Sequence, residues 1–248
     1  MKLLIINPNI STSVTELIGQ EARRVASPST VITTVTAELG VAYIETRFEA
    51  MLGAYATAEL AARHADVHDA VIVAAFGDPG LAALREVLDI PVLGLTESAL
   101  MSACMLGQRF SIIAISRRIS AWYRETVQTN GLLDRLASIR TLDQRVQNIG
   151  SIQNDHADEL KALCMQAIEQ DGADVLIIAG APLAGLARTI AADIPVPLVD
   201  GVSSAVRHAE SLIALGTHAP KSGSFAHPPV KPNKGLSPAI QNILNPVT

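Results

Sequence analysis

Short apolar runs alternate along this chain with longer stretches in which apolar residues recur at helical spacing. The runs Leu3–Ile6, Val71–Ala75 and Val175–Ala179 are continuously apolar, as is typical of parallel strands that are buried on both faces. Val31–Thr36 alternates between apolar and polar residues, and Arg109–Ile113 is predicted to be a further strand. Helices are predicted from a capping box at Ser13 and Glu16, and at Glu49–His68, Ala121–Asn130 and Asp155–Gln170.

Two stretches of the sequence resemble each other. Asp69–Ala99 and Asp174–Ser203 both read as an apolar strand, a tight turn, a helix and a second strand. The tetrapeptide Asp89–Val92 recurs as Asp193–Val196. An internal duplication of this kind predicts two similar α/β halves, with a cleft between them that can present one group from each half to a small molecule.

The order strand–helix–strand–helix, which occurs twice, predicts an α/β fold of two pseudo-symmetric, doubly wound parallel-sheet domains. We expect the first domain to comprise residues 1–95 together with about 200–216, and the second to comprise residues 96–199. Residues 217–248 are rich in proline and are predicted to form a tail with a helical turn at 238–244. Ligands of open parallel sheets bind beyond the carboxyl ends of the strands, so we expect the site there.

Composition narrows the class of protein. The chain is 49% hydrophobic and 17% charged, which indicates a globular fold, and its net charge of −5 argues against a nucleic-acid partner. No signal peptide and no apolar run of about 20 residues is visible, so we expect a cytoplasmic protein without a membrane partner. Cys104 and Cys164 are expected to be reduced thiols. His64 and His68 lack a third ligand, so no metal is expected. We also expect the protein to be a homo-oligomer.

Five motifs in the predicted loops resemble, in their order along the chain, those of one known family. They are Asn7–Asn9, Ile44–Glu45, Phe76–Leu81, Arg109–Ser111 and Val199–Val202. Over roughly residues 1–215 the sequence resembles the hydantoin and allantoin racemases of the aspartate/glutamate racemase superfamily. The resemblance implies an active site between two α/β domains, a cyclic ureide or amino-acid-derived carboxylate as substrate, and an isomerase without a cofactor. In that family one cysteine thiolate removes the proton next to a carbonyl, and a second thiol returns a proton from the opposite face.

Both of these cysteines are replaced in this sequence. Ala75 stands directly before the F-G-D-P-G motif, and Ala181 follows Gly180 at the end of a predicted strand. A methyl group cannot transfer a proton, so two-thiol racemisation is not possible for the sequence as written. The neighbouring segments Pro182–Ala184 and Ala114–Ile115 also differ from the family pattern, which favours a natural branch over an engineered pair of Cys-to-Ala changes.

Further candidates lie in the loops at the expected cleft. Glu97 is a candidate general base, and Asp78 is either a group that handles protons or the cap of the helix that follows it. Asp200 aligns with Thr96 in the repeat and is expected to cap a helix together with Ser203. The candidate substrate-binding residues are Pro8, Asn9, Tyr43, Ile44, Phe76, Gly77, Thr96, Ser98, Ala114, Ile115, Ser116, Pro182, Leu183 and Asp200.

The sequence therefore predicts a racemase-type isomerase of this family, in which the catalytic positions Ala75 and Ala181 lack their thiols. Two alternatives stay open. The same cleft could serve a hydrolase or a lyase in which Glu97 or Asp78 handles protons. It could also belong to a catalytically silent homologue that only binds a ligand.

Overall fold

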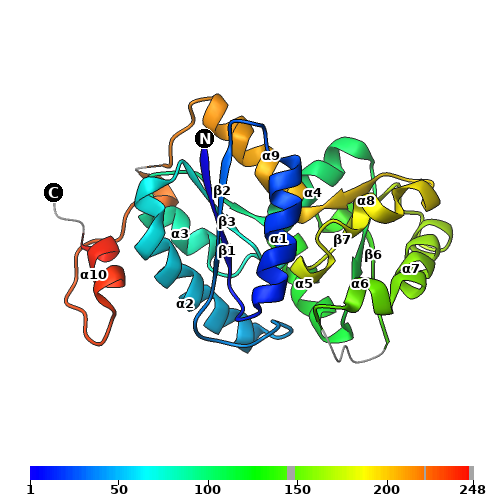
Figure 1. Ribbon diagram of the computed structural model, residues 1–248, viewed down its shortest axis with the longest axis horizontal. Coiled ribbons are helices and arrows are strands. Elements are labelled where there is room, and N and C mark those ends of the chain that lie inside the picture. Colours follow the sequence, from blue (N-terminus) through cyan, green and yellow to red (C-terminus); the bar gives the residue numbers. More distant parts are fainter. Residues whose placement is uncertain (144–148, 221, 246–248) are drawn as a thin grey trace.

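The structure is a computed structural model, and it describes residues 1–143, 149–220 and 222–245. The described residues form two four-stranded parallel sheets that lie side by side (Figure 1). We call the part built on the order β2-β1-β3-β4 the first half, and the part built on β6-β5-β7-β8 the second half. The strands are β1 Lys2–Asn7, β2 Val31–Thr36, β3 Ala70–Val73, β4 Val92–Gly94, β5 Phe110–Ala114, β6 Leu136–Thr141, β7 Val175–Ile178 and β8 Leu198–Asp200. The predicted α/β class with two similar parallel-sheet domains is confirmed.

Burial explains why the inner strands read as continuous apolar runs. Along β1, Leu3 and Ile5 pack on one face of the sheet in a cluster with residues of helices α1 (Thr12–Val25) and α9 (Gly201–Ala214). Leu4 and Ile6 pack on the other face in a second cluster with residues of helices α2 (Arg47–His64) and α3 (Leu81–Val87). Because successive side chains of a strand point to opposite faces, a strand covered on both sides needs apolar residues at every position. The outer strands β2 and β6 are only partly buried and keep polar residues.

Helices cover both sheets, and most of them come next after a strand in the order of elements. They are α1 Thr12–Val25, α2 Arg47–His64, α3 Leu81–Val87, α4 Leu95–Leu106, α5 Ser120–Thr129, α6 Ile152–Asp155, α7 Ala157–Glu169, α8 Leu186–Ile190, α9 Gly201–Ala214 and α10 Pro238–Leu244. The predicted capping box at Ser13 is wrong. The cap of α1 is Ser11, whose side chain accepts a hydrogen bond from the backbone N–H of Val14.

Two helices join the halves. α4 follows β4 of the first half but also packs against β7 and β8 of the second. α9 follows β8 of the second half but packs against α1, β3 and β4 of the first, and it lies against α4. These contacts support the proposal that residues 200–216 belong to the first domain, while the exact domain boundaries stay a prediction.

The ends of β4 and β8 align the two halves differently from the sequence repeat. Val73 pairs with Gly94, and Ile178 pairs with Asp200. Val73 and Ile178 are themselves equivalent, because each is the last residue of its strand to pair with the central neighbour. Asp200 therefore corresponds to Gly94, and its predicted alignment with Thr96 is wrong. The D-I-P-V copy runs into β4 in the first half but ends before β8 in the second.

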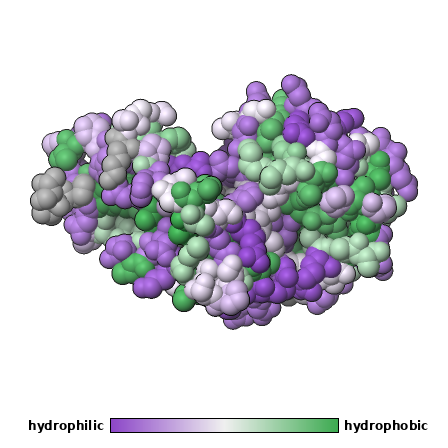
Figure 2. All heavy atoms as spheres, turned by 90° about the horizontal axis from the view of Figure 1, so that it is seen from above, coloured by the Kyte–Doolittle hydropathy of each residue, from purple (hydrophilic) through white to green (hydrophobic). Residues whose placement is uncertain are grey.

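The C-terminal segment ends in α10, which packs against α2 at the outer end of the first half (Figure 1). The predicted helical turn at 238–244 is confirmed. On the face seen in Figure 2, hydrophobic residues gather in several areas separated by polar ones. None of the helices in the described ranges combines the length and the apolar character that crossing a membrane requires.

Candidate active site

A small cavity lies where the carboxyl ends of the two sheets face each other. Its lining comes from both halves and consists of Asn9, Tyr43, Ile44, Ala75, Phe76, Tyr123, Gly180, Ala181 and Pro182. We call it the interdomain cavity. The centres of water molecules can occupy about 20 Å³ of this cavity, so it has room for about one water molecule. Two loops that are far apart in the sequence, one after β3 and one after β7, thus meet at one site.

The first-half wall is a tight turn that directly follows β3. The N–H of Asp78 donates to the carbonyl of Ala75 at 3.1 Å and closes this turn. Gly77 has a φ of +105°, which few residues other than glycine adopt, and its N–H donates to Thr96 Oγ1 at 2.5 Å. The turn holds Ala75 and Phe76 at the cavity and leaves Gly77 behind them.

The second-half wall follows β7 in the same way. Gly180 has a φ of +108° and begins a single helical turn, Ala181–Leu183. Ala181 and Pro182 line the cavity, whereas the Leu183 side chain is fully buried in the core of the second half. Each half therefore contributes an alanine at the position where the family resemblance expects a cysteine.

Four backbone N–H groups in these two walls have no hydrogen-bond acceptor in the described part of the chain. Among the described residues, the N–H groups of Ala75, Phe76, Gly180 and Ala181 find no acceptor. Two belong to each half. Buried backbone donors normally have a partner, and sets of unpaired N–H groups bind carboxylate or carbonyl oxygens.

Three side chains add polar groups to the same cavity. Asn9 Oδ1 accepts from Asn7 Nδ2 at 3.1 Å and from the N–H of Ser11 at 2.9 Å, which leaves Asn9 Nδ2 free of an acceptor within the described part of the chain. The Tyr43 hydroxyl is buried and has no hydrogen-bond partner among the described residues. The Tyr123 hydroxyl donates to none of them either.

The two phenols are donors rather than bases. Burial raises the pKa of Tyr43 well above its usual value, and the nearby Tyr123, Glu45 and Glu49 raise it further. Burial, together with the charge of Asp78, also raises the pKa of Tyr123. Both hydroxyls therefore stay protonated near neutral pH, so they can donate hydrogen bonds to a substrate oxygen but cannot remove its proton.

Asp78 lies behind the wall and not in it. Its carboxylate accepts from the N–H groups of Thr96 and Glu97, both at 2.8 Å, at the start of α4. The predicted cap of the helix that follows Asp78 is wrong, because α3 begins after Gly80 without a side-chain cap. Burial raises the pKa of Asp78 to about 7, against the hydrogen bonds from Thr96 and Glu97 that lower it. Asp78 is the one described residue other than glycine with a positive φ, +49°.

The structure does not bring Glu97 to the cavity. Its carboxylate forms an ion pair with the Arg85 guanidinium at 2.5 Å. A carboxylate held by an arginine and absent from the cavity lining is a poor general base for a ligand there. The predicted base role of Glu97 is therefore not supported by the geometry.

The other predicted residues divide into lining residues and supporting ones. The predictions that lie at the cavity are Asn9, Tyr43, Ile44, Ala75, Phe76, Ala181 and Pro182. Those that lie outside its lining are Pro8, Gly77, Asp78, Thr96, Glu97, Ser98, Ala114, Ile115, Ser116, Leu183 and Asp200. Ala114 and Ile115 are fully buried in the core. Ser116 accepts from the N–H of Arg118, and Asp200 caps α9 through the N–H of Ser203, as predicted.

Sequence reasoning missed Tyr123, which from the sequence is expected to pack at a helix or subunit face. It lies on α5, and its ring packs against Phe76 of the first half with the ring centres 4.7 Å apart. No spacing along the chain signals that contact. Gly180 is the other lining residue outside the predicted set, and the resemblance had marked it only as the neighbour of Ala181.

The described residues offer neither a metal site nor a thiol at this cavity. No group of three or more potential metal-ligating side chains occurs among them. Cys164 is buried in the core of the second half, where burial raises the pKa of its thiol to about 12, and Cys104 lies on α4. Neither cysteine lines the cavity.

Comparison with known proteins agrees with this geometry. The sequence profile described as Asp/Glu/Hydantoin racemase matches residues 3–209. The chain belongs to this racemase family. A curated hydantoin racemase from Paenarthrobacter aurescens is 34% identical over 233 residues, which cover 93% of this chain and 99% of that protein.

Solved structures of the racemase family extend the likeness to the whole fold. An allantoin racemase from Klebsiella pneumoniae superposes with a TM-score of 0.92 at 33% identity, and the match covers 97% of this chain and 98% of that one. An allantoin racemase from Pseudomonas fluorescens gives a TM-score of 0.89 at 34% identity and covers 95% and 100%. These relatives are racemases, which are isomerases, and they support a racemase function for this chain.

Proposed function

We propose that this chain is a racemase-type isomerase that holds a small cyclic ureide or an amino-acid-derived carboxylate in the interdomain cavity. One observation carries the proposal: Ala75 and Ala181, from opposite halves, line the same small cavity. A carbon atom bound between them presents one face to each half, as inversion of a stereocentre requires. The names of the similar racemases support the substrate class.

The chain's own groups are suited to bind such a substrate and to make its C–H bond more acidic. The free N–H groups of Phe76 and Gly180, together with the neutral Tyr43 and Tyr123 hydroxyls, are donors for carbonyl or carboxylate oxygens. A hydrogen bond to the carbonyl next to the reacting carbon stabilises the negative charge that develops when the proton leaves. The alanine methyl groups cannot take that proton, so transfer by thiols requires cysteine at both positions.

We further propose that the protein works in the cytoplasm, as a homo-oligomer and without a cofactor. The two cysteines are unpaired, which supports a reducing compartment. Large apolar side chains exposed on this single chain, such as Met105 and Leu215, support contacts between copies.

The first test is proton exchange in D₂O with L- and D-5-substituted hydantoins and with allantoin. The unaltered protein, A75C, A181C and the double variant are compared by loss of the α-proton signal and by optical rotation. We expect the ligand to protect all four proteins from thermal unfolding. Each single variant should exchange the proton of one enantiomer with retention, because its thiol reaches one face. The double variant should exchange and racemise.

Two outcomes would count against parts of this proposal, and exchange by the unaltered chain would identify the kind of base it uses. A folded double variant that binds ligand without exchanging its proton would show that positions 75 and 181 do not flank the reacting carbon. An absence of thermal protection by every compound would refute the ureide substrate class. Exchange by the unaltered chain above the solvent rate would show that a base other than a thiol serves the cavity.

A further inference from the structure

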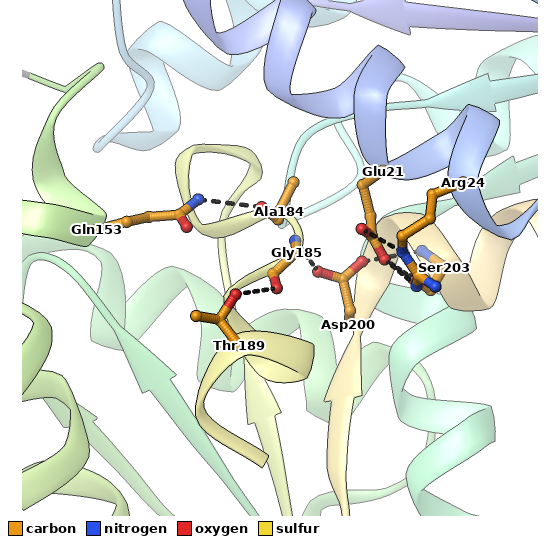
Figure 3. A network of polar contacts seen from close by, with 8 residues as sticks. All are labelled: Glu21, Arg24, Gln153, Ala184, Gly185, Thr189, Asp200 and Ser203. Carbon is orange, nitrogen blue, oxygen red and sulfur yellow. Dashed lines mark hydrogen bonds and ion pairs between the residues drawn. The ribbon is translucent and has the colours of Figure 1, made fainter. Parts of the chain in front are cut away.

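The loop that carries Ala181 is held from behind by two polar side chains. The Asp200 carboxylate accepts from the N–H of Gly185 at 2.8 Å and from the N–H of Ser203 at 2.9 Å (Figure 3). From the opposite side, Gln153 Nε2 donates to the carbonyls of Pro182 at 2.9 Å and Ala184 at 3.0 Å. Both ends of the short segment between Ala181 and Gly185 are thus fixed to other elements.

The first half reaches the back of this loop as well. Glu21 of α1 is 4% exposed, and its carboxylate accepts from Ser203 Oγ at 2.6 Å and forms an ion pair with Arg24 (Figure 3). A Cβ on Gly185 would lie 3.1 Å from Glu21 Oε2, so the glycine lets the loop backbone approach the carboxylate closely. The contact joins the loop of one half to a helix of the other.

Asp78 does the equivalent work for Ala75. Its carboxylate ties the turn after β3 to the start of α4, through the N–H groups of Thr96 and Glu97. A Cβ on Gly94 would lie 2.2 Å from Asp78 Cγ, so the carboxylate occupies the space beside Gly94. Because Gly94 corresponds to Asp200, each half has a carboxylate at the end of its fourth strand in chain order, β4 or β8. Asp200 supplies it from β8 itself, and Asp78 supplies it beside Gly94 from the loop after β3.

Stability alone gives no reason for these two carboxylates. Burial raises the pKa of both Asp78 and Asp200, so the ionised form of each is disfavoured in the folded protein. Asp78 also holds a φ of +49°, which costs conformational energy in a residue with a side chain. A serine or asparagine caps a helix without a buried charge. What the carboxylates add is a second acceptor oxygen. In Asp200 it links the Gly185 N–H to the start of α9, and in Asp78 the two oxygens bind two N–H groups at the start of α4.

We infer that Asp78 and Asp200 are a pseudo-symmetric pair of positioning residues, each of which fixes the cavity residue and free N–H groups of its own half. Asp78 acts on positions 75 and 76. Asp200, assisted by Gln153, acts on positions 180 and 181. That these two residues matter for catalysis rests on the proposed function. Their effect on the geometry of the two loops can be measured without any substrate.

The test places a thiol probe at each position in turn. A75C and A181C are prepared in a C104A background, since Cys164 is buried, and each is combined with D78N, D200N or Q153A. The readouts are the pKa of the introduced thiol, from thiolate absorbance, and its rate of alkylation. An asparagine keeps the shape of the aspartate but offers one acceptor oxygen instead of two. T189A is the matched control, because Thr189 donates to the Gly185 carbonyl from α8, the helix that follows the loop.

We expect a crossed pattern. D200N and Q153A should change the alkylation rate at position 181 by at least about threefold, which half a pKa unit produces, and leave position 75 unchanged. D78N should do the reverse, and T189A should affect neither thiol. Equal changes at both positions would indicate general loosening and would overturn the inference, as would folded D78N and D200N proteins in which neither thiol changes. If D200N does not fold, Q153A decides the second half.

Because no substrate is present, these results do not depend on the ureide assignment. A crossed pattern together with no proton exchange in the double cysteine variant would refute the proposed function and keep the positioning roles. The double cysteine variant could also exchange the substrate proton equally fast with and without D78N or D200N. That result would keep the proposed function and would refute a role of Asp78 and Asp200 in catalysis.

Discussion

Single residues shape the cavity wall, and Gly77 shows this most directly. A Cβ at this position would lie 2.1 Å from the Trp122 ring of the second half, and the φ of +105° is strained for any other residue. The close approach lets Trp122 pack over the turn that holds Ala75 and Phe76. The glycine of the F-G-D-P-G motif is therefore explained by a contact between the halves and not by the turn alone.

We predict that Gly77→Ala lowers the free energy of unfolding by about 2–4 kcal/mol, from overpacking and from backbone strain together. Gly131→Ala is the matched control, since Gly131 has a φ of +70° but nothing within 4 Å of its added Cβ. It should lose only about 1–2 kcal/mol. Urea unfolding measures both. Trp122 is the only tryptophan of the chain, so its fluorescence should also change in the first variant alone. Equal losses in the two variants would contradict the contact with Trp122.

At the scale of elements, α9 is joined to the first half by a buried carboxylate. Glu210 accepts from the N–H of Ser27 at 2.7 Å, from Ser27 Oγ at 3.0 Å and from Thr30 Oγ1 at 2.6 Å. Ser27 and Thr30 lie in the connection between α1 and β2. Because α9 follows the last strand of the second half, this carboxylate holds a helix near the C-terminal end of the fold against a loop near its N-terminal end.

We predict that Glu210→Gln lowers the free energy of unfolding at pH 7 by about 1–3 kcal/mol, because an amide cannot accept all of these hydrogen bonds. Burial raises the pKa of Glu210, but the hydrogen bonds from Thr30 and Ser27 outweigh it, so the folded pKa is lowered. The stabilisation is therefore complete above the usual range of a glutamate and is lost as pH falls through the lower folded pKa. Urea unfolding from pH 7 into acid should show the two proteins converge. Glu16→Gln, at an exposed residue of α1, is the control and should change little. A difference that persists in acid would contradict this prediction.

For the whole molecule, the small size of the cavity leads us to expect that the halves move apart when a ligand enters. The space of about 20 Å³ for water centres is far below the roughly 300 Å³ or more of typical ligand pockets. Two contacts join the halves on this part of the molecule: Phe76 packs on Tyr123, both of which line the cavity, and Arg47 on α2 forms an exposed ion pair with Glu125 on α5. We expect ligand entry to break the ion pair.

We predict that Arg47→Gln speeds both association and dissociation of a bound hydantoin while the free energy of unfolding stays nearly unchanged. An exposed ion pair contributes little to stability but holds the closed arrangement until it breaks. Stopped-flow fluorescence of Trp122 measures the rates. Arg63→Gln is the control, because Arg63 pairs with Glu38 and Glu59 within the first half. Rates that match those of the control would show that the pair does not restrain opening.

The sequence by itself determined the parallel-sheet halves and the two alanine positions. A strand that is buried on both faces must be apolar throughout, so local patterns reveal it without knowledge of its neighbours. The turns after β3 and β7 are equally local, because glycines at positive φ mark them. The internal repeat predicted a cleft between two halves, and the resemblance to the racemase family marked Ala75 and Ala181 as the positions of its two cysteines.

Only the tertiary structure decided which other groups surround those alanines. Tyr123 reaches the cavity because α5 of the second half packs on the first, and Gln153 reaches the Ala181 loop from a different helix. Asp78 caps α4 and not α3, the helix that follows it in the sequence, because its partners Thr96 and Glu97 lie at the start of α4. These contacts join residues that are distant along the chain, and spacing in the sequence carries no record of them.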